Sequence, residues 1–157
     1  TDGVQWLVEQ GIVDPNKVCI VGSSFGGYAA GMGLSKTPDV YKCGISINGV
    51  LDMKLFARNV IRHNNYNQEL TNSEWGIKKV SPYHLAKNIK APLLLVVGEA
   101  DSVVDPKNSH KMKKRLNKLG KTVELVELPA GEHWRTIESN ELLKFKTMNK
   151  FLSTYLD

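Results

Sequence analysis

The stretch that decides the fold is residues 18–28, Val-Cys-Ile-Val-Gly-Ser-Ser-Phe-Gly-Gly-Tyr. Its first four residues are apolar and of strand type, and the small residues of 28–34 suit a helix. Between the two lies a glycine-rich turn that contains Ser24. The pattern therefore predicts a strand, a tight turn and a helix, with Ser24 on the turn.

Ser24 lies in the pattern Gly-x-Ser-x-Gly, which Gly22 and Gly26 complete. In such a turn a Cβ two residues before or after the serine would crowd the strand or the helix, and we expect both glycines to be needed for that reason. The turn would lift the hydroxyl above the carboxyl end of the strand and aim the first helix amides at developing negative charge. In a plainer interpretation Ser24 is only the cap of the helix.

Further strands are predicted at residues 41–48, 91–98 and 123–128, and helices at 1–11, 106–119 and 140–156. The apolar run at 91–98 is nearly continuous, which indicates a strand covered on both faces, as in a parallel sheet. The alternation of strands and helices predicts an α/β fold with right-handed crossovers. Residues 53–90 are polar and only loosely periodic, so we expect an insertion of short helices and loops. This insertion either overhangs the site or covers the sheet as a helix with a surface loop.

Three side chains suited to nucleophilic catalysis follow strands of the predicted sheet: Ser24, Asp101 and His133. A serine hydroxyl needs a base within hydrogen-bond reach, and that base needs an orienting group. The chain order Ser, Asp, His is that of an α/β-hydrolase. We expect His133 to take the serine proton, Asp101 to orient the imidazole, and the backbone N–H of Phe25 to donate to an oxyanion.

Each of these roles has a rival in the sequence. Asp105 lies in the same loop as Asp101, but it directly precedes Pro106 and suits a helix cap. The other histidines are His63 and His84, in the insertion, and His110, inside a predicted helix. Because His133 alone lies on a loop that follows a predicted strand, the sequence favours it as the base.

Composition limits the remaining possibilities. The chain has 157 residues, a net charge of +5 and 41% hydrophobic residues, enough for one domain, and no segment is long enough to span a membrane. Much of the positive charge lies between residues 107 and 121 without interleaved aromatics, which indicates a solvated basic helix and argues against nucleic-acid binding. Cys19 and Cys43 fall in predicted strands, and we expect both to be free, buried thiols.

Four stretches of the chain form a larger pattern: residues 22–28, Ser81-Pro82, residues 92–101 and the loop at His133. In these stretches the chain resembles the catalytic domain of the prolyl oligopeptidase family of serine peptidases, which includes dipeptidyl and acylaminoacyl peptidases. It implies an α/β-hydrolase fold and cleavage of peptide bonds through an acyl-enzyme, with a peptide substrate and with no metal or cofactor. Phe25 stands where the family often has tyrosine, and Trp134 follows the histidine where a small residue is common.

The family fold also implies more strands than this sequence predicts, so we expect residues 1–157 to be a C-terminal part of the catalytic domain. A second oxyanion donor and the edge strands would then come from a preceding segment, or the open edge would associate with another copy. A carboxylesterase on the same fold, or an inactive fragment that acts as an interaction module, remains an alternative. No signal peptide is visible, which leaves the compartment open, with the cytoplasm favoured.

Overall fold

A computed structural model describes residues 1–64, 76–135 and 137–156. Its centre is a four-stranded sheet in the order β1-β2-β3-β4, with every neighbouring pair parallel. The strands are β1 (Cys19–Ser23), β2 (Cys43–Ile47), β3 (Leu93–Gly98) and β4 (Val123–Leu128). The helices are α1 (Asp2–Glu9), α2 (Phe25–Lys36), α3 (Met53–Asn64), α5 (Pro82–Leu85), the 3₁₀ turn η1 (Ala86–Asn88), α6 (Lys107–Lys118) and α7 (Glu138–Leu156). The predicted α/β fold with about four parallel strands is confirmed.

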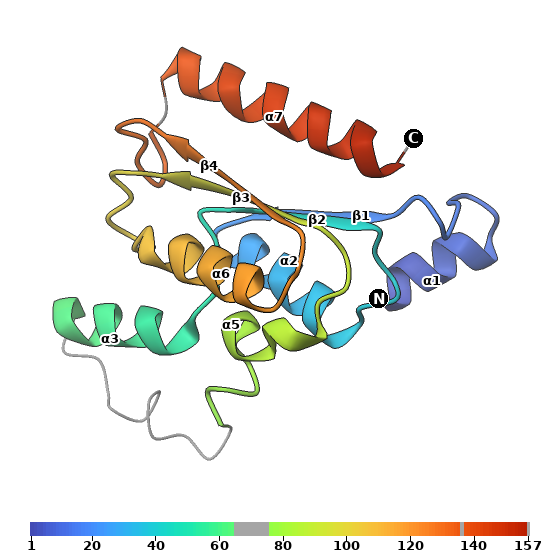
Figure 1. Ribbon diagram of the computed structural model, residues 1–157, viewed down its shortest axis with the longest axis horizontal. Helices are drawn as coiled ribbons and strands as arrows, with labels where there is room; N and C mark the ends of the chain where they lie inside the picture. Colours follow the sequence, from blue (N-terminus) through green and yellow to red (C-terminus); the bar gives the residue numbers. More distant parts are fainter. Residues whose placement is uncertain (65–75, 136, 157) are drawn as a thin grey trace.

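The helices form two layers around the sheet. Figure 1 shows α2, α5 and α6 on one face and α7 on the other. Because the strand order runs in one direction, crossovers of the same hand all lie on the same face. The helix that follows the last strand, α7, is not part of a crossover, and it covers the opposite face.

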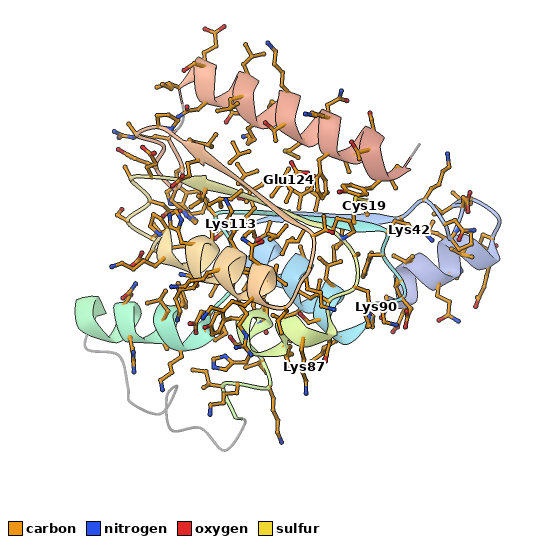
Figure 2. All side chains as sticks on the ribbon, in the orientation of Figure 1. Cys19, Lys42, Lys87, Lys90, Lys113 and Glu124 are labelled. Atoms are coloured by element: carbon orange, nitrogen blue, oxygen red, sulfur yellow. A yellow bond between two sulfur atoms is a disulfide. The ribbon has the colours of Figure 1, made fainter. Side chains whose placement is uncertain are left out.

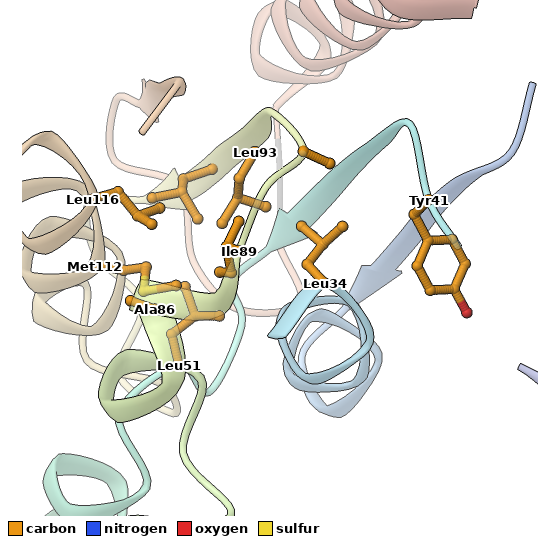
Figure 3. Packing of buried hydrophobic residues seen from close by; sticks show 10 residues of the cluster. Leu34, Tyr41, Leu51, Ala86, Ile89, Leu93, Met112 and Leu116 are labelled. Carbon is orange, nitrogen blue, oxygen red and sulfur yellow. The ribbon is translucent and has the colours of Figure 1, made fainter. Parts of the chain in front are cut away.

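Each face of the sheet buries its own apolar cluster, and side chains fill both spaces between the layers (Figure 2). β3 supplies both clusters, since successive side chains of a strand point to opposite faces. Leu93 and Leu95 pack under α2, α5 and α6 (Figure 3), whereas Leu94 and Val96 pack under α7. This explains why residues 93–98 read as a continuous apolar run, since all six are buried.

The turn from β1 to α2 depends on close approach of backbone. A Cβ at Gly22 would overlap the backbone of Gly26, as the sequence predicted. The matching expectation for Gly26 is wrong, because a Cβ there would meet nothing within 4 Å. The second tight approach lies one residue later, where a Cβ at Gly27 would come within 2.8 Å of the Cα of Gly49, after β2.

The insertion begins more regularly than predicted. Residues 53–64 form the continuous helix α3 instead of short pieces. Asp52 caps this helix, since its Oδ1 accepts hydrogen bonds from the amides of Lys54 and Leu55 at 3.1 and 3.3 Å. The rest of the expected insertion includes residues 65–75, which lie outside the described residues, and ends in α5 and η1.

The expectation of two free thiols is also wrong, because Cys19 and Cys43 form a disulfide. The two residues are direct partners in the parallel pairing of β1 with β2, and their Cα atoms lie 4.7 Å apart. That separation is within the range that a disulfide spans. The pairing depends on strand register, which the sequence does not state.

The disulfide makes a first prediction. Under denaturing, non-reducing conditions, iodoacetamide should add nothing to the chain, because both sulfurs are in the cross-link. The same sample should take up two carbamidomethyl groups after reduction, as read from the intact mass. Two adducts before reduction would show that the thiols are free.

The close approach of Gly22 to Gly26 gives a second prediction. Gly22→Ala should lower the free energy of unfolding by about 3 kcal/mol, because the added Cβ meets backbone that cannot move aside cheaply. Gly26→Ala, the matched control, should leave the stability unchanged or slightly raised, because alanine favours a helix. Urea unfolding of the two variants measures the difference, and equal losses would contradict the close approach.

Candidate active site

Loops at the carboxyl edge of the sheet bring together Ser24, Asp101 and His133. Ser24 follows β1, Asp101 follows β3 and His133 follows β4. The strands are parallel, so these three ends lie at the same edge, where α/β sheets place their ligands. Ser24 and His133, which are 109 positions apart in sequence, thereby become neighbours.

The three side chains form a chain of hydrogen bonds. His133 Nδ1 lies 2.7 Å from Asp101 Oδ2, and His133 Nε2 lies 2.9 Å from Ser24 Oγ. A carboxylate can only accept a hydrogen bond, so Nδ1 carries the ring hydrogen and its N–H donates a hydrogen bond to Asp101 Oδ2. Nε2 of the neutral ring is therefore the acceptor that faces the serine hydroxyl. This is the tautomer that a general base needs.

Asp101 is fixed from its other side. Its Oδ1 accepts hydrogen bonds from the backbone amides of Val103 and Val104, at 2.9 and 2.8 Å. The side chains of Asp101 and His133 are 0% and 2% exposed, so water does not compete for their contact. The backbone thus holds one carboxylate oxygen in place while the other orients the imidazole.

The Ser24 hydroxyl does not cap the helix, which counts against the plainer interpretation of the turn. Ser24 occupies the N-cap position of α2 but makes no side-chain cap hydrogen bond. Its backbone has φ 56° and ψ −116°, a conformation that costs energy for any residue with a Cβ. A hydrogen bond from its amide to the carbonyl of Ile47, at 2.8 Å, holds the turn against the end of β2.

The Phe25 amide, the expected oxyanion donor, lies in the first turn of α2, directly after Ser24. Amides of a first helical turn have no acceptor within the helix, and the helix dipole favours negative charge there. The Phe25 side chain is 72% exposed. Its backbone is thus placed beside the serine while its ring lies at the surface.

The rival residues have other partners. Asp105 accepts a hydrogen bond from the amide of Lys107 at 2.8 Å, which is the capping arrangement that the sequence suggested. His110 Nε2 lies 3.4 Å from Glu127 Oε1 of β4, and both side chains are partly exposed. Burial lowers the pKa of His84, a residue of α5 whose Nδ1 is buried without a partner among the described residues. The side chain of His63 lies outside the described residues.

Two positioning features were missed by sequence reasoning. Asn48, at the end of β2, has φ 46°, and its Oδ1 accepts a hydrogen bond from the amide of Gly98 at 2.8 Å. The amide of Ala100 donates to the carbonyl of Gly131 at 2.9 Å, which ties the Asp101 loop to the His133 loop. A Cβ at Gly98 would overlap Gly131, so only glycine permits this approach.

Trp134 borders the site as an exposed aromatic. Its ring meets that of His133 edge to face, with centroids 4.4 Å apart, and the residue is 79% exposed. Together with Phe25, which directly follows the serine in sequence, it places exposed apolar surface next to the hydrogen-bonded chain. The signal for this feature was already in the sequence as the departure noted at residue 134.

The described residues hold no cluster of three or more His, Cys, Asp or Glu side chains that could bind a metal ion. Among the helices of the same residues, none has the length and apolar character needed to cross a bilayer.

The chain is similar in sequence to known dipeptidyl peptidases. The dipeptidyl aminopeptidase BIII of Pseudoxanthomonas mexicana is 31% identical over 143 residues, which is 84% of this chain and 21% of that protein. The inactive dipeptidyl peptidase 10 of Mus musculus is 28% identical over 98% of this chain and 19% of that protein. The chain thus spans about a fifth of the length of these relatives.

A solved structure of a puromycin-hydrolyzing peptidase of Mycobacterium tuberculosis matches with a TM-score of 0.90 at 25% identity, over 98% of this chain and 24% of that one. The match places the four parallel strands and their helices within an α/β-hydrolase peptidase fold. The family model described as "Prolyl oligopeptidase family" matches residues 1–157, and this chain therefore belongs to the prolyl oligopeptidase family of serine peptidases.

Proposed function

We propose that this chain carries the catalytic triad of a serine peptidase that cleaves peptide bonds through an acyl-enzyme. The observation that carries the proposal is the continuous hydrogen-bonded chain from Ser24 through His133 to Asp101. In it each group has the hydrogen-bond partner that the first chemical step requires. Family membership supports the same reaction class.

In the first half of the reaction Ser24 Oγ attacks the carbonyl carbon of the substrate while its proton passes to His133 Nε2. Asp101, fixed by two backbone amides, stabilises the imidazolium that forms. The negative charge on the substrate oxygen lies near the start of α2, where the Phe25 N–H donates to it. The tetrahedral intermediate collapses when His133 gives its proton to the leaving amine, which leaves the acyl group on Ser24.

The second half repeats these steps with water. His133 takes a proton from a water molecule, the hydroxide attacks the acyl carbon, and the proton returns to Ser24 Oγ as the acid leaves. No metal or cofactor takes part in this scheme. In this mechanism the chain is the triad-bearing part of a larger catalytic domain. The second oxyanion donor is supplied from outside the 157 residues.

The triad assignment can be tested with a fluorophosphonate, which forms a covalent adduct with an activated serine. We expect one adduct per chain by intact mass, and none in Ser24→Ala or His133→Ala, because either change removes the nucleophile or its base. Asp101→Asn should slow labelling by about 10³- to 10⁴-fold, since the imidazole loses its orienting carboxylate.

His110→Ala and Asp105→Asn serve as matched controls, because both residues bind elsewhere. They should label at the rate of the unchanged chain. Losses comparable to that of His133→Ala would show that the wrong side chains have been assigned. An unlabelled but folded chain would favour the inactive-module alternative, for which the inactive dipeptidyl peptidase 10 of the mouse is a precedent.

Peptidase and esterase chemistry can be separated with a peptide amide and its matched ester. We expect the protein to hydrolyse both, with the ester faster because its leaving group needs less help from His133. The comparison is made by kcat/KM on substrates that differ only in the scissile bond. Hydrolysis of the ester alone would leave the triad in place but assign the protein to the carboxylesterases.

A further inference from the structure

A second candidate site lies between α5 and α6, away from Ser24. It is a pocket of about 350 Å³ lined by Tyr83 and by the cations Lys111, Lys114, Arg115 and Lys118. The four cations are spaced at i, i+3, i+4 and i+7 along α6, which places them on one face of the helix. The basic stretch that composition suggested to be a solvated helix therefore lines a concave surface.

Acidic side chains offset little of this charge. Asp52, which is 2% exposed, forms an ion pair with Lys111. Among the described residues no carboxylate lies within salt-bridge distance of Lys114, Arg115 or Lys118. Like charges four residues apart on a helix repel each other. The two cations within each of the pairs Lys111–Arg115 and Lys114–Lys118 therefore repel each other unless an anion lies between them.

Arg115, one of the residues that line the pocket, has an unused hydrogen-bond donor. Arg115 Nε is buried and has no partner among the described residues. The ring of Tyr83 is covered by two cations, with Lys111 Nζ 4.7 Å and the guanidinium carbon of Arg115 5.3 Å from its centroid. These contacts hold two cations in place at the pocket.

We propose that this pocket binds a compact polyvalent phosphate anion, a pyrophosphate group or a small phosphorylated molecule. Four positive charges against the single negative charge of Asp52 call for a ligand of more than one negative charge. Arginine forks and lysine point charges are the usual ligands of phosphate oxygens. The proposal is independent of the peptidase function, because the pocket shares no residue with the hydrogen-bonded chain at Ser24.

Size and stacking argue for a compact anion over a nucleic acid. The cations span seven residues of helix, or about 10 Å, which suits two or three phosphates and no long polymer. Among the described residues Tyr83 is the one aromatic residue in the lining, and its ring already contacts Lys111 and Arg115, so a base would have to compete with these cations for it.

The test is calorimetric titration of the full chain with inorganic pyrophosphate at low and physiological ionic strength. We expect one site per chain, weakened by salt because the contacts are ionic. Lys114→Gln with Lys118→Gln should weaken binding by about tenfold or more, since two charge-assisted contacts are lost. Both lysines are exposed, so the fold should survive, as checked by circular dichroism.

The matched control is Lys113→Gln with Lys121→Gln, which removes the same charge from residues that do not line the pocket. It should change the affinity by less than about twofold. The Nε–H resonance of Arg115, assigned with Arg115→Lys, should shift on addition of pyrophosphate, because this donor gains an acceptor.

Three results would overturn the proposal. One is the absence of saturable pyrophosphate binding to the folded chain. Another is an equal loss of affinity in the control and pocket variants, which would indicate general charge attraction. The third is tighter binding of tetraglutamate than of pyrophosphate, which would assign the pocket to an acidic peptide segment.

Discussion

The backbone of Ser24 is the constraint on which the rest of the site depends. A residue with a Cβ at φ 56° and ψ −116° costs of order 1–3 kcal/mol, and the surrounding structure has to enforce it. Two close backbone contacts, Gly22 with Gly26 and Gly27 with Gly49, help to enforce this conformation. The hydrogen bond from the Ser24 amide to β2 also contributes. The hydroxyl is consequently aimed by the junction of β1, α2 and β2 and not by its own rotamer preference.

His133 has to reach that hydroxyl from the loop that follows β4, at the other end of the strand order from β1. β3 and β4 make this possible, because the amide of Glu99 donates to Leu128 and that of Ala100 to Gly131 just beyond the strand ends. The loops of Asp101 and His133 are therefore linked to each other as one unit. Asn48 joins this unit to β2 through the Gly98 amide. The 2.9 Å contact at Ser24 depends on the register of all four strands.

The sequence was informative wherever one residue type at one position has a single physical explanation. The apolar run of β3, the glycine-flanked Ser24 and the one histidine after a strand could all be read directly. Relations between strands could not be read, so the pairing of Cys19 with Cys43 and the role of Asn48 were missed. The expectation for Gly26 failed because a motif names positions but does not say which of them faces the neighbouring backbone. The continuity of helix α3 was missed because residues 53–90 are polar and only loosely periodic in the sequence.

Asp52 is also the residue that relates the basic pocket to the rest of the molecule. It follows β2 at the catalytic edge, caps α3, and pairs with Lys111 of α6. Burial opposes its charge, but the hydrogen bond from Lys111, the amide of Leu55 and the charge of Lys111 together hold the pKa of Asp52 below its ordinary value. A ligand that drew Lys111 away would leave a buried carboxylate unpaired, which is costly. We therefore expect an anion to bind mainly through Lys114, Arg115 and Lys118. Lys111 would keep its ion pair with Asp52, and the edge of the sheet would stay undisturbed.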